Sequence, residues 1–376
     1  MIERYLNIAR EVIDLSLKQG AEQVSVSLAN ATSFQLEVRN QNIEALKEAG
    51  SSGIHVTLAK NQKRSTLSSN DFRLETLEPL IRSTLEALPL MGEDPFYTLP
   101  DPKLQGKAEI DLQFRDPNFE KMASNEKINE LMLLEKEALS IDSRLQTEEI
   151  SFSDSISYMV HGDSNGFLEG CSKTLCSQGV SMFAEDGGEE TEGSSQSLNT
   201  GRKQSDGWYS SSRFRKDLES REDLARKAGE RTLRKLGSVK PKSCEVPVVF
   251  STEMAQSFLG SLASAMMGDN VFRKHSFLKD SLGETVANPE IRLSDEPLLP
   301  GKLGSRHYDN EGVKATPLML IDQGKLLSFM CSTYSANKLN RQSTGHAGGI
   351  SNLMLKPGIY SDEELIASID KGLYLT

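Results

Sequence analysis

The stretch from residue 246 to residue 269 constrains the fold of this 376-residue chain most strongly. It opens with a short β-branched apolar run ending at Phe250, which favours a buried strand over a helix. Ser251 or Thr252 can then cap a helix, and Gly268 can end it. The helix carries an apolar stripe at intervals of four: Met254, Phe258, Leu262 and Met266. Small residues fill the other positions, so we expect a helix buried on more than one side, with Phe258 and Leu262 inside.

The residues after this helix form a series of short motifs. They are Ser276-Phe-Leu278, Leu282-Gly-Glu284, Pro297 to Gly301, Leu303 to Arg306, Asp309-Asn-Glu-Gly312, Leu320 to Gly324 and Ser343-Thr-Gly345. In this order and spacing they resemble the C-terminal domain of the PmbA/TldD family, the so-called modulators of DNA gyrase. The resemblance extends over most of the chain and is densest between residues 246 and 360.

The resemblance implies a heterodimeric zinc metallopeptidase built from two paralogous subunits. One subunit carries a zinc-binding His-Glu-x-x-x-His motif on the helix described above. The corresponding positions here are Leu259, Gly260 and Ser264, none of which can bind zinc or activate water. The chain therefore resembles the metal-less PmbA (TldE) subunit. We expect no catalytic residue and no cofactor in this chain, with zinc in the partner subunit.

Composition and charge limit the function classes further. A formal net charge of -11 weighs against a general electrostatic grip on nucleic acid. No apolar run approaches the roughly 20 residues that a membrane-spanning helix needs, and the N-terminus lacks the apolar core of a signal peptide. Four cysteines in a chain of this length do not make a disulfide framework. We therefore expect a cytoplasmic protein without membrane or nucleic-acid partners.

The expected fold class is α+β with several domains. Residues 1–100 are predicted as an N-terminal α+β domain, with an opening helix that Gly20 ends and a second helix over residues 74–88. Alternating apolar residues predict separate strands near residues 24–28, 34–38 and 54–58. Asn30 and the segment 50–53 are predicted turns between them.

Residues 101–240 are predicted as a middle α+β domain. Helical periodicity covers residues 126–142 and 220–236, and alternation predicts strands at residues 150–152, 156–160 and 173–184. Ser164-Asn-Gly166 is a typical hairpin turn. The acidic, Gly/Ser-rich tract 185–197 is predicted as a mobile loop.

Residues 241–376 are predicted as a β-rich C-terminal core domain around the buried helix. Asp322-Gln-Gly324 predicts a hairpin between residues 318–321 and 325–330, and residues 362–371 predict a short helix. Family members continue for several dozen residues past the counterpart of Thr376, so this domain is expected to be truncated at its C-terminal end.

Other residues with catalytic or metal-binding potential show no recognisable pattern. No two of the five histidines are spaced four apart on a helix, and Cys171 and Cys176 are too isolated for a zinc knuckle. We expect unlinked thiols at both. The glycines of residues 345–349 lack a phosphate-binding motif and predict a tight loop. Four loop acids could pair or bind calcium, but such acids usually bond their own turns; they are Asp269, Asp309, Glu311 and Asp322.

Three functions fit these observations. The first is a non-catalytic subunit that pairs with the zinc-bearing TldD-like paralogue to process or degrade unfolded peptides, such as peptide precursors and antitoxin-type proteins. The second is an autonomous hydrolase with an unrecognised site. The third is a peptide-binding module that forms a homodimer when alone. A zinc assay separates the first from the second, and co-purification with the paralogue separates the first from the third.

Overall fold

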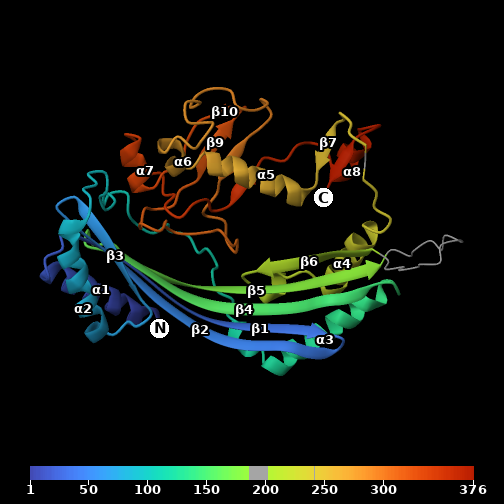
Figure 1. Ribbon diagram of the computed structural model, residues 1–376, viewed down its shortest axis with the longest axis horizontal. Helices are drawn as coiled ribbons and strands as arrows, with labels where there is room; N and C mark the ends of the chain where they lie inside the picture. Colours follow the sequence, from blue (N-terminus) through green and yellow to red (C-terminus); the bar gives the residue numbers. More distant parts are fainter. Residues whose placement is uncertain (186–201, 241) are drawn as a thin grey trace, which may run out of the picture.

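The computed structural model describes residues 1–185, 202–240 and 242–376, so nearly all of the predicted acidic loop lies outside the described residues. The chain forms two parts, a long curved sheet with helices on one face and a C-terminal domain above the other face (Figure 1). Together they make a mixed α+β protein, as predicted.

The sheet has six antiparallel strands in the order β3-β2-β1-β4-β5-β6. Its strands are β1 (Gln23–Arg39), β2 (Asn42–Lys60), β3 (Lys63–Ser69), β4 (Gln146–Asp163), β5 (Leu168–Glu185) and β6 (Lys203–Ser212). Its helices are α1 (Ile2–Lys18), α2 (Leu74–Ala87), α3 (Ser124–Ser140) and α4 (Arg221–Arg234). The helix predictions over these regions and the hairpin at Ser164–Gly166 are confirmed.

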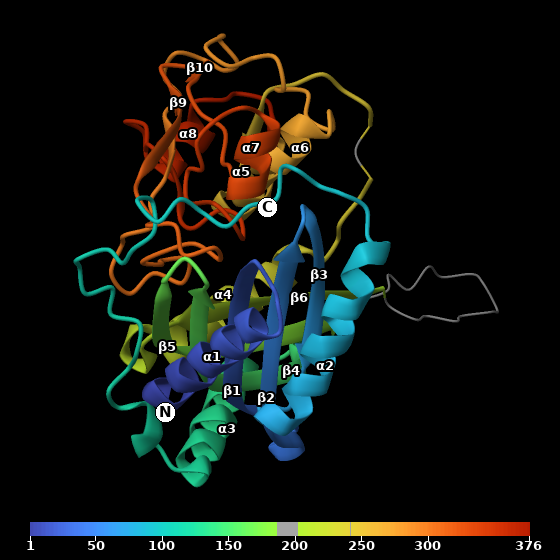
Figure 2. The ribbon, with the colours of Figure 1, turned by 90° about the vertical axis from the view of Figure 1, so that its left-hand side faces the viewer.

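Two hydrophobic cores lie under the same face of this sheet. Figure 2 shows the helices that cover this face, among them α1, α2 and α3. Even-numbered residues of β1 serve both: Val26 packs with α1 and α2, while Leu36 packs with α3 and α4. On β4, Val160 belongs to the first core and Ile150 to the second. Because side chains alternate along a strand, the odd-numbered residues of both strands face the C-terminal domain.

The predicted division at residue 100 runs through this sheet. Strands from residues 1–100 and 101–240 hydrogen-bond directly where β1 pairs with β4, from Ser25–Asp163 to Val38–Ile150. The first core also takes Val160 from the middle segment, and the second takes Leu36 from the N-terminal one. The two segments therefore share one scaffold and are not separately packed layers.

Two predicted turns are wrong. Asn30 lies inside β1 and the segment 50–53 lies inside β2, where Ala31 pairs with Ser51. The chain turns instead at Asn40-Gln41 and Asn61-Gln62, all four with positive φ between 51° and 59°. Pairs of positive φ values match the twist of antiparallel strands. Alternation across Asn30 continues without a break, because a polar residue on a half-exposed strand does not interrupt pairing.

The C-terminal domain contains short elements joined by long irregular segments. They are β7 (Val248–Phe250), α5 (Thr252–Ala265), α6 (Gly268–Phe272), β8 (Leu293–Asp295), β9 (Leu318–Asp322), β10 (Lys325–Leu326), α7 (Thr333–Lys338), β11 (Leu353–Leu355), α8 (Asp362–Ala367) and β12 (Leu373–Leu375). The hairpin of β9 and β10 is confirmed, with positive φ at Gln323 and Gly324, but β10 is shorter than predicted. The expected strand at Phe250 forms β7, which pairs in parallel with β12.

Candidate functional site

Helix α5 begins as its sequence predicts. Ser251 is the N-cap, and its side chain accepts a hydrogen bond from the Met254 N–H at 3.3 Å. Glu253 in the first turn pairs with Arg231 of α4 at 3.5 Å, so the start of α5 is joined to the helix layer of the sheet.

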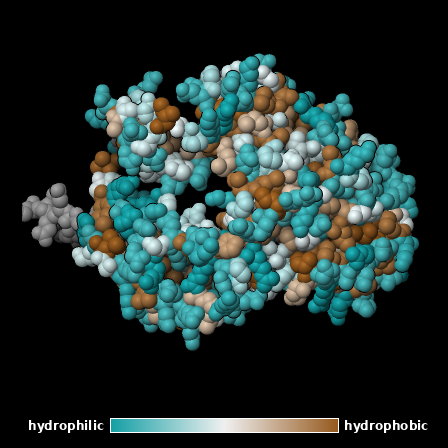
Figure 3. Space-filling model, turned by 180° about the vertical axis from the view of Figure 1, so that it is seen from behind, coloured by the Kyte–Doolittle hydropathy of each residue, from teal (hydrophilic) through white to brown (hydrophobic). Residues whose placement is uncertain are grey.

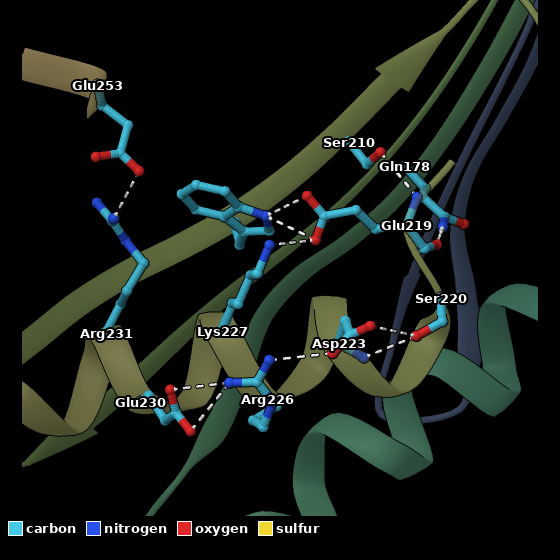
Figure 4. Close-up of polar contacts among 11 residues, drawn as sticks. Gln178, Ser210, Glu219, Ser220, Asp223, Arg226, Lys227, Glu230, Arg231 and Glu253 are labelled. Atoms are coloured by element: carbon cyan, nitrogen blue, oxygen red, sulfur yellow. Dashed lines mark hydrogen bonds and ion pairs between the residues drawn. The ribbon is translucent and has the colours of Figure 1, made fainter. Parts of the chain in front are cut away.

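Figure 4 shows the polar network around this junction. Arg231 also contacts Asp206, while Lys227 of the same helix binds Glu219 at 2.8 Å. The Glu219 carboxylate in turn accepts a hydrogen bond from the Trp208 indole at 3.1 Å. The network joins one end of α5 to the sheet part, and its charged groups are paired with one another.

The burial predicted for α5 is wrong over most of its length. Phe258 is 66% exposed and stacks on Phe250 of β7 at 6.2 Å between ring centroids, while Leu262 is half-buried. The last turn is buried, at Ala263, Ala265 and Met266. The apolar residues at intervals of four therefore form a helix face that is largely exposed on the N-terminal half of α5.

The three positions aligned with the zinc motif lie on this helix without a metal-binding arrangement. Leu259 packs against the C-terminal core, and a Cβ on Gly260 would meet open space. Ser264 is exposed and accepts a hydrogen bond from Asn270 at 3.2 Å. In the described part of the chain, no three His, Cys, Asp or Glu residues come close enough to hold a metal ion. These residues do not fit a zinc site.

The sheet face opposite α5 is lined by small side chains. Half-buried residues of β4 alternate with core residues, and cross-strand partners on β1 continue the same rows, such as Ser157 with Ala31. The β4 residues of this face include Ser151, Ser153, Ser155 and Ser157, followed by the larger Met159 and His161. An opening separates the two parts in the space-filling view from behind (Figure 3). We refer to the stretch of this face from Ser151 to Ser157 as the serine-lined face.

The acids of Asp309-Asn-Glu-Gly312 serve the backbone. The Asp309 carboxylate is 1% exposed and accepts hydrogen bonds from the N–H groups of Glu311, Val313 and Ala347 at 2.9 to 3.0 Å. Glu311 accepts from the Thr333 N–H at 2.8 Å. Burial raises the pKa of both carboxyl groups, and their bonds to the backbone oppose that rise. This geometry is that of turn residues, as expected for loop acids.

The remaining candidate residues are also structural. In the glycine-rich loop, the His346 ring binds the buried Asp295 carboxylate at 3.1 Å. Asp322 pairs with Arg292 at 2.6 Å, and Asp269 lies in α6. Cys171 and Cys176 both lie on β5 as free thiols, which confirms the prediction that they are unlinked.

A cavity of about 430 Å³ lies where the segment 304–310 approaches the sheet. Cys171 and Lys173 of β5 line it together with His161 of β4 and His307 of the C-terminal domain. Sequence reasoning placed Lys173 at the start of a strand but assigned it no role. The available signal was the alternation itself, because Cys171 and Lys173 interrupt the small side chains that cover this face.

Two family domains match the chain. The PmbA/TldA metallopeptidase central domain matches residues 117–236, and the C-terminal domain matches residues 243–376. A metalloprotease PmbA homolog from Buchnera aphidicola is 30% identical over 99% of this chain and 80% of its own length. The chain belongs to the PmbA/TldD family. Metalloprotease PmbA from Escherichia coli O157:H7 is 27% identical, with 100% of this chain and 81% of that protein covered.

Solved structures of PmbA/TldD relatives share the fold. A protein from Bacteroides thetaiotaomicron, named as a modulator of DNA gyrase, superposes with a TM-score of 0.89 and 28% identity, covering 98% of this chain and 81% of that one. TldE from Thermococcus kodakarensis has a TM-score of 0.82 at 20% identity, covering 98% and 82%. At that identity the second likeness supports the fold alone. The predicted family is confirmed by these matches.

Proposed function

We propose that this chain is the metal-less subunit of a heterodimeric zinc metallopeptidase of the PmbA/TldD family. The proposal rests on the residues that helix α5 carries. The helix is intact and capped, yet Leu259, Gly260 and Ser264 occupy the positions of the zinc motif. The catalytic zinc then belongs to a TldD-like paralogue, and this chain holds none.

The sheet face supports a role in holding unfolded peptide. Its serines and alanines are short, so an extended chain can approach without displacing bulky side chains. Extended peptides gain affinity mainly through their backbone groups, which every sequence possesses. We infer that the substrates are unfolded peptides, including precursors that are matured by cleavage and antitoxin-type proteins.

The exposed apolar surface around α5 supports association with another protein chain. Phe250 is 48% exposed, Phe258 66% and Met254 37%, and they gather on two adjoining elements. Exposed apolar clusters of this kind are typical of interaction surfaces. We assign this surface to contact with the paralogue, and its position beside the serine-lined face would complete a closed chamber.

The free cysteines support our proposal for the cellular setting. All four cysteines are free thiols, as is usual where the medium is reducing. No helix in the described residues has the length and apolar character to cross a membrane. We infer a cytoplasmic site of action.

The test is reconstitution. The isolated chain should leave an unfolded peptide such as reduced, carboxymethylated lactalbumin intact, and added paralogue should produce cleavage that a chelator abolishes. Activity at fixed paralogue should rise with this chain and saturate at a fixed ratio. Elemental analysis should find no stoichiometric zinc in this chain alone.

A triple variant provides the matched control. Introducing L259H, G260E and S264H should not create activity in the isolated chain, because the two imidazoles supply two zinc ligands and catalytic zinc sites use three from the protein. Full activity of the paralogue alone would show that this chain is dispensable and would overturn the proposal. Cleavage by the isolated wild-type chain would instead indicate an autonomous hydrolase.

A further inference from the structure

The cavity beside Lys173 contains a positive charge without an acidic partner. The Lys173 ammonium lies 4.7 Å from the centre of the Phe114 ring and donates a long hydrogen bond of 3.4 Å to the Ser305 carbonyl oxygen. Across the described ranges, no carboxylate lies within 4.0 Å of it. Burial lowers the pKa of Lys173, and the nearby Arg213 and Arg306 lower it further.

Two acids near the cavity, Asp309 and Glu169, do not pair with Lys173. Asp309 lines the cavity, but its two carboxylate oxygens accept three backbone N–H groups. Glu169 lies on the same face of β5, four residues from Lys173, which is about 13 Å along a strand. Neither acid neutralises the lysine at short range, so the charge of Lys173 is left for a ligand.

Further polar groups of the cavity region are also incompletely bonded. The His307 ring is 9% exposed, packs edge-on against Phe114 at 5.2 Å, and its Nδ1 has no hydrogen-bond partner. Arg213 is 6% exposed and donates only to the carbonyl oxygens of Thr174 and Leu303. Buried polar groups without partners are costly, so these groups would gain from a polar ligand or a water molecule.

The rest of the lining is mainly apolar and aromatic, with Ser27, His55, Arg306 and Asn310 as its further polar residues. Phe114, Met159, Val160 and Tyr308 contribute to the walls, while the cavity volume of about 430 Å³ lies within the range of small-molecule sites. The Arg306 guanidinium also lines the cavity, but its Nη2 already donates to the carbonyl oxygens of Gly345 and Gly349. The Lys173 ammonium and the His307 imidazole then match a single carboxylate, whereas a phosphate group usually needs more donors. The apolar walls fit a hydrocarbon or aromatic portion next to that carboxylate.

We propose that this cavity binds an organic carboxylate, with the Lys173 ammonium as its counter-ion and the apolar body against Phe114 and Met159. The carboxylate could come from a free small acid or from the C-terminus of a peptide, because both offer the same group. The inference goes beyond the subunit function proposed above and uses no residue of α5. Its failure would leave the reconstitution result unchanged.

The first experiment uses the wild-type chain and its own thiols. Cys171 lines the cavity, whereas Cys244 is exposed outside it, so Cys244 is an internal reference. Alkylation by iodoacetamide is followed by mass spectrometry with benzoate, the dipeptide Gly-Phe or Gly-Phe amide at millimolar concentration. We expect Gly-Phe to slow modification of Cys171 severalfold and to leave Cys244 unaffected, while the amide protects neither.

The second experiment measures affinity by calorimetry in three variants. Lys173→Gln should weaken binding of the protective carboxylate by about tenfold or more, whereas Lys173→Arg should bind within a few fold of wild type. Lys47→Gln makes the same charge change on an exposed residue of the same sheet face, outside the cavity, and should have no effect. Thermal melting of each variant verifies its fold.

The possible outcomes distinguish a free organic acid from a peptide C-terminus as the ligand, and both from failure of the proposal. Protection by benzoate equal to that by Gly-Phe identifies a free organic acid as sufficient, and protection by Gly-Phe alone identifies a peptide C-terminus. Equal protection by the acid and the amide would overturn the role of the carboxylate. Absence of protection by every probe, or binding unchanged in Lys173→Gln, would overturn the proposal.

Discussion

The sheet part and the C-terminal domain are held together in different ways. In the sheet, strands of 17, 19, 18 and 18 residues pair side by side, and regular alternation supplies two cores. In the C-terminal domain, the longest strand has 5 residues and the hairpin partner has 2. Long segments without regular structure leave many backbone groups that no strand partner satisfies.

Buried acids supply those missing partners in the C-terminal domain. Asp309 accepts three backbone N–H groups, and Asp295 accepts the Ser351 N–H at 2.9 Å besides binding His346. Burial opposes ionisation of Asp295, but hydrogen bonds from His346 and Ser351 outweigh it and lower its pKa. The comparison teaches that apolar periodicity along long strands organises the sheet part, whereas the C-terminal domain combines its own hydrophobic core with buried acids that bind irregular backbone.

Removing one of these buried acids should therefore have the largest effect on the free energy of unfolding. Asp309→Ala leaves three buried N–H groups without an acceptor and should lower the free energy of unfolding of the C-terminal domain by about 4 kcal/mol. Denaturant unfolding combined with hydrogen exchange measures the loss and locates it. Asp322→Ala is the control, since that acid pairs with one half-exposed arginine and should cost about 1 kcal/mol or less. A loss below that of the control would contradict the role of Asp309.

Truncating a core leucine tests the shared sheet. Leu36 is 1% exposed, and Leu36→Ala should destabilise the sheet part by about 3 kcal/mol. Its cross-strand partner Leu46 is 47% exposed, so Leu46→Ala makes the same change for less than about 1 kcal/mol. Hydrogen exchange should show faster opening around both cores in Leu36→Ala, because β1 serves both. Faster exchange confined to the core of α3 and α4 would argue against one cooperative unit.

Acid should weaken the sheet part through His161. Burial lowers the pKa of His161 from 6.5 to about 4, so the folded chain resists the proton that the unfolded chain takes up below pH 6.5. The free energy of unfolding should fall by about 2 kcal/mol between pH 7 and pH 5. The measurement is urea unfolding at both values, with His161→Gln as the variant in which this fall should disappear. An equal fall in the variant would assign the pH dependence to other groups.

The smallest effect is expected on the exposed half of α5. Phe258→Ser removes a side chain that is 66% exposed and should change the free energy of unfolding by less than about 0.5 kcal/mol. The same variant should weaken association with the paralogue, measured by analytical ultracentrifugation. A large loss of stability would show that Phe258 packs inside the isolated chain.

Sequence periodicity predicted the helices of the sheet part well, because amphipathic helices carry their own boundary signals. It failed at strand ends: Asn30 and the segment 50–53 continue through strands, while Asn40-Gln41 and Asn61-Gln62 turn. Polar residues occur both in turns and on the open face of a sheet, and one sequence does not separate the two. The same ambiguity affected α5, since an apolar stripe faces either a core or another chain.

The candidate site was predictable only in part. The proposal that Leu259, Gly260 and Ser264 replace a zinc motif comes from the family resemblance of the sequence. The cavity at Lys173 was not predictable, because its walls come from Phe114, β4, β5 and the segment 304–310. Residues separated by more than a hundred positions meet there only once the C-terminal domain lies over the sheet.

The central position of β1 has a consequence for synthesis on the ribosome. Its first hairpin can close once β2 has emerged, but its other edge pairs with residues as distant as Asp163, opposite Ser25. At roughly 5–20 residues per second, that edge waits for several seconds with its N–H and C=O groups unpaired. A nascent chain is therefore vulnerable to pairing with a neighbouring nascent chain during this interval, and slower translation before residue 146 would lengthen its exposure.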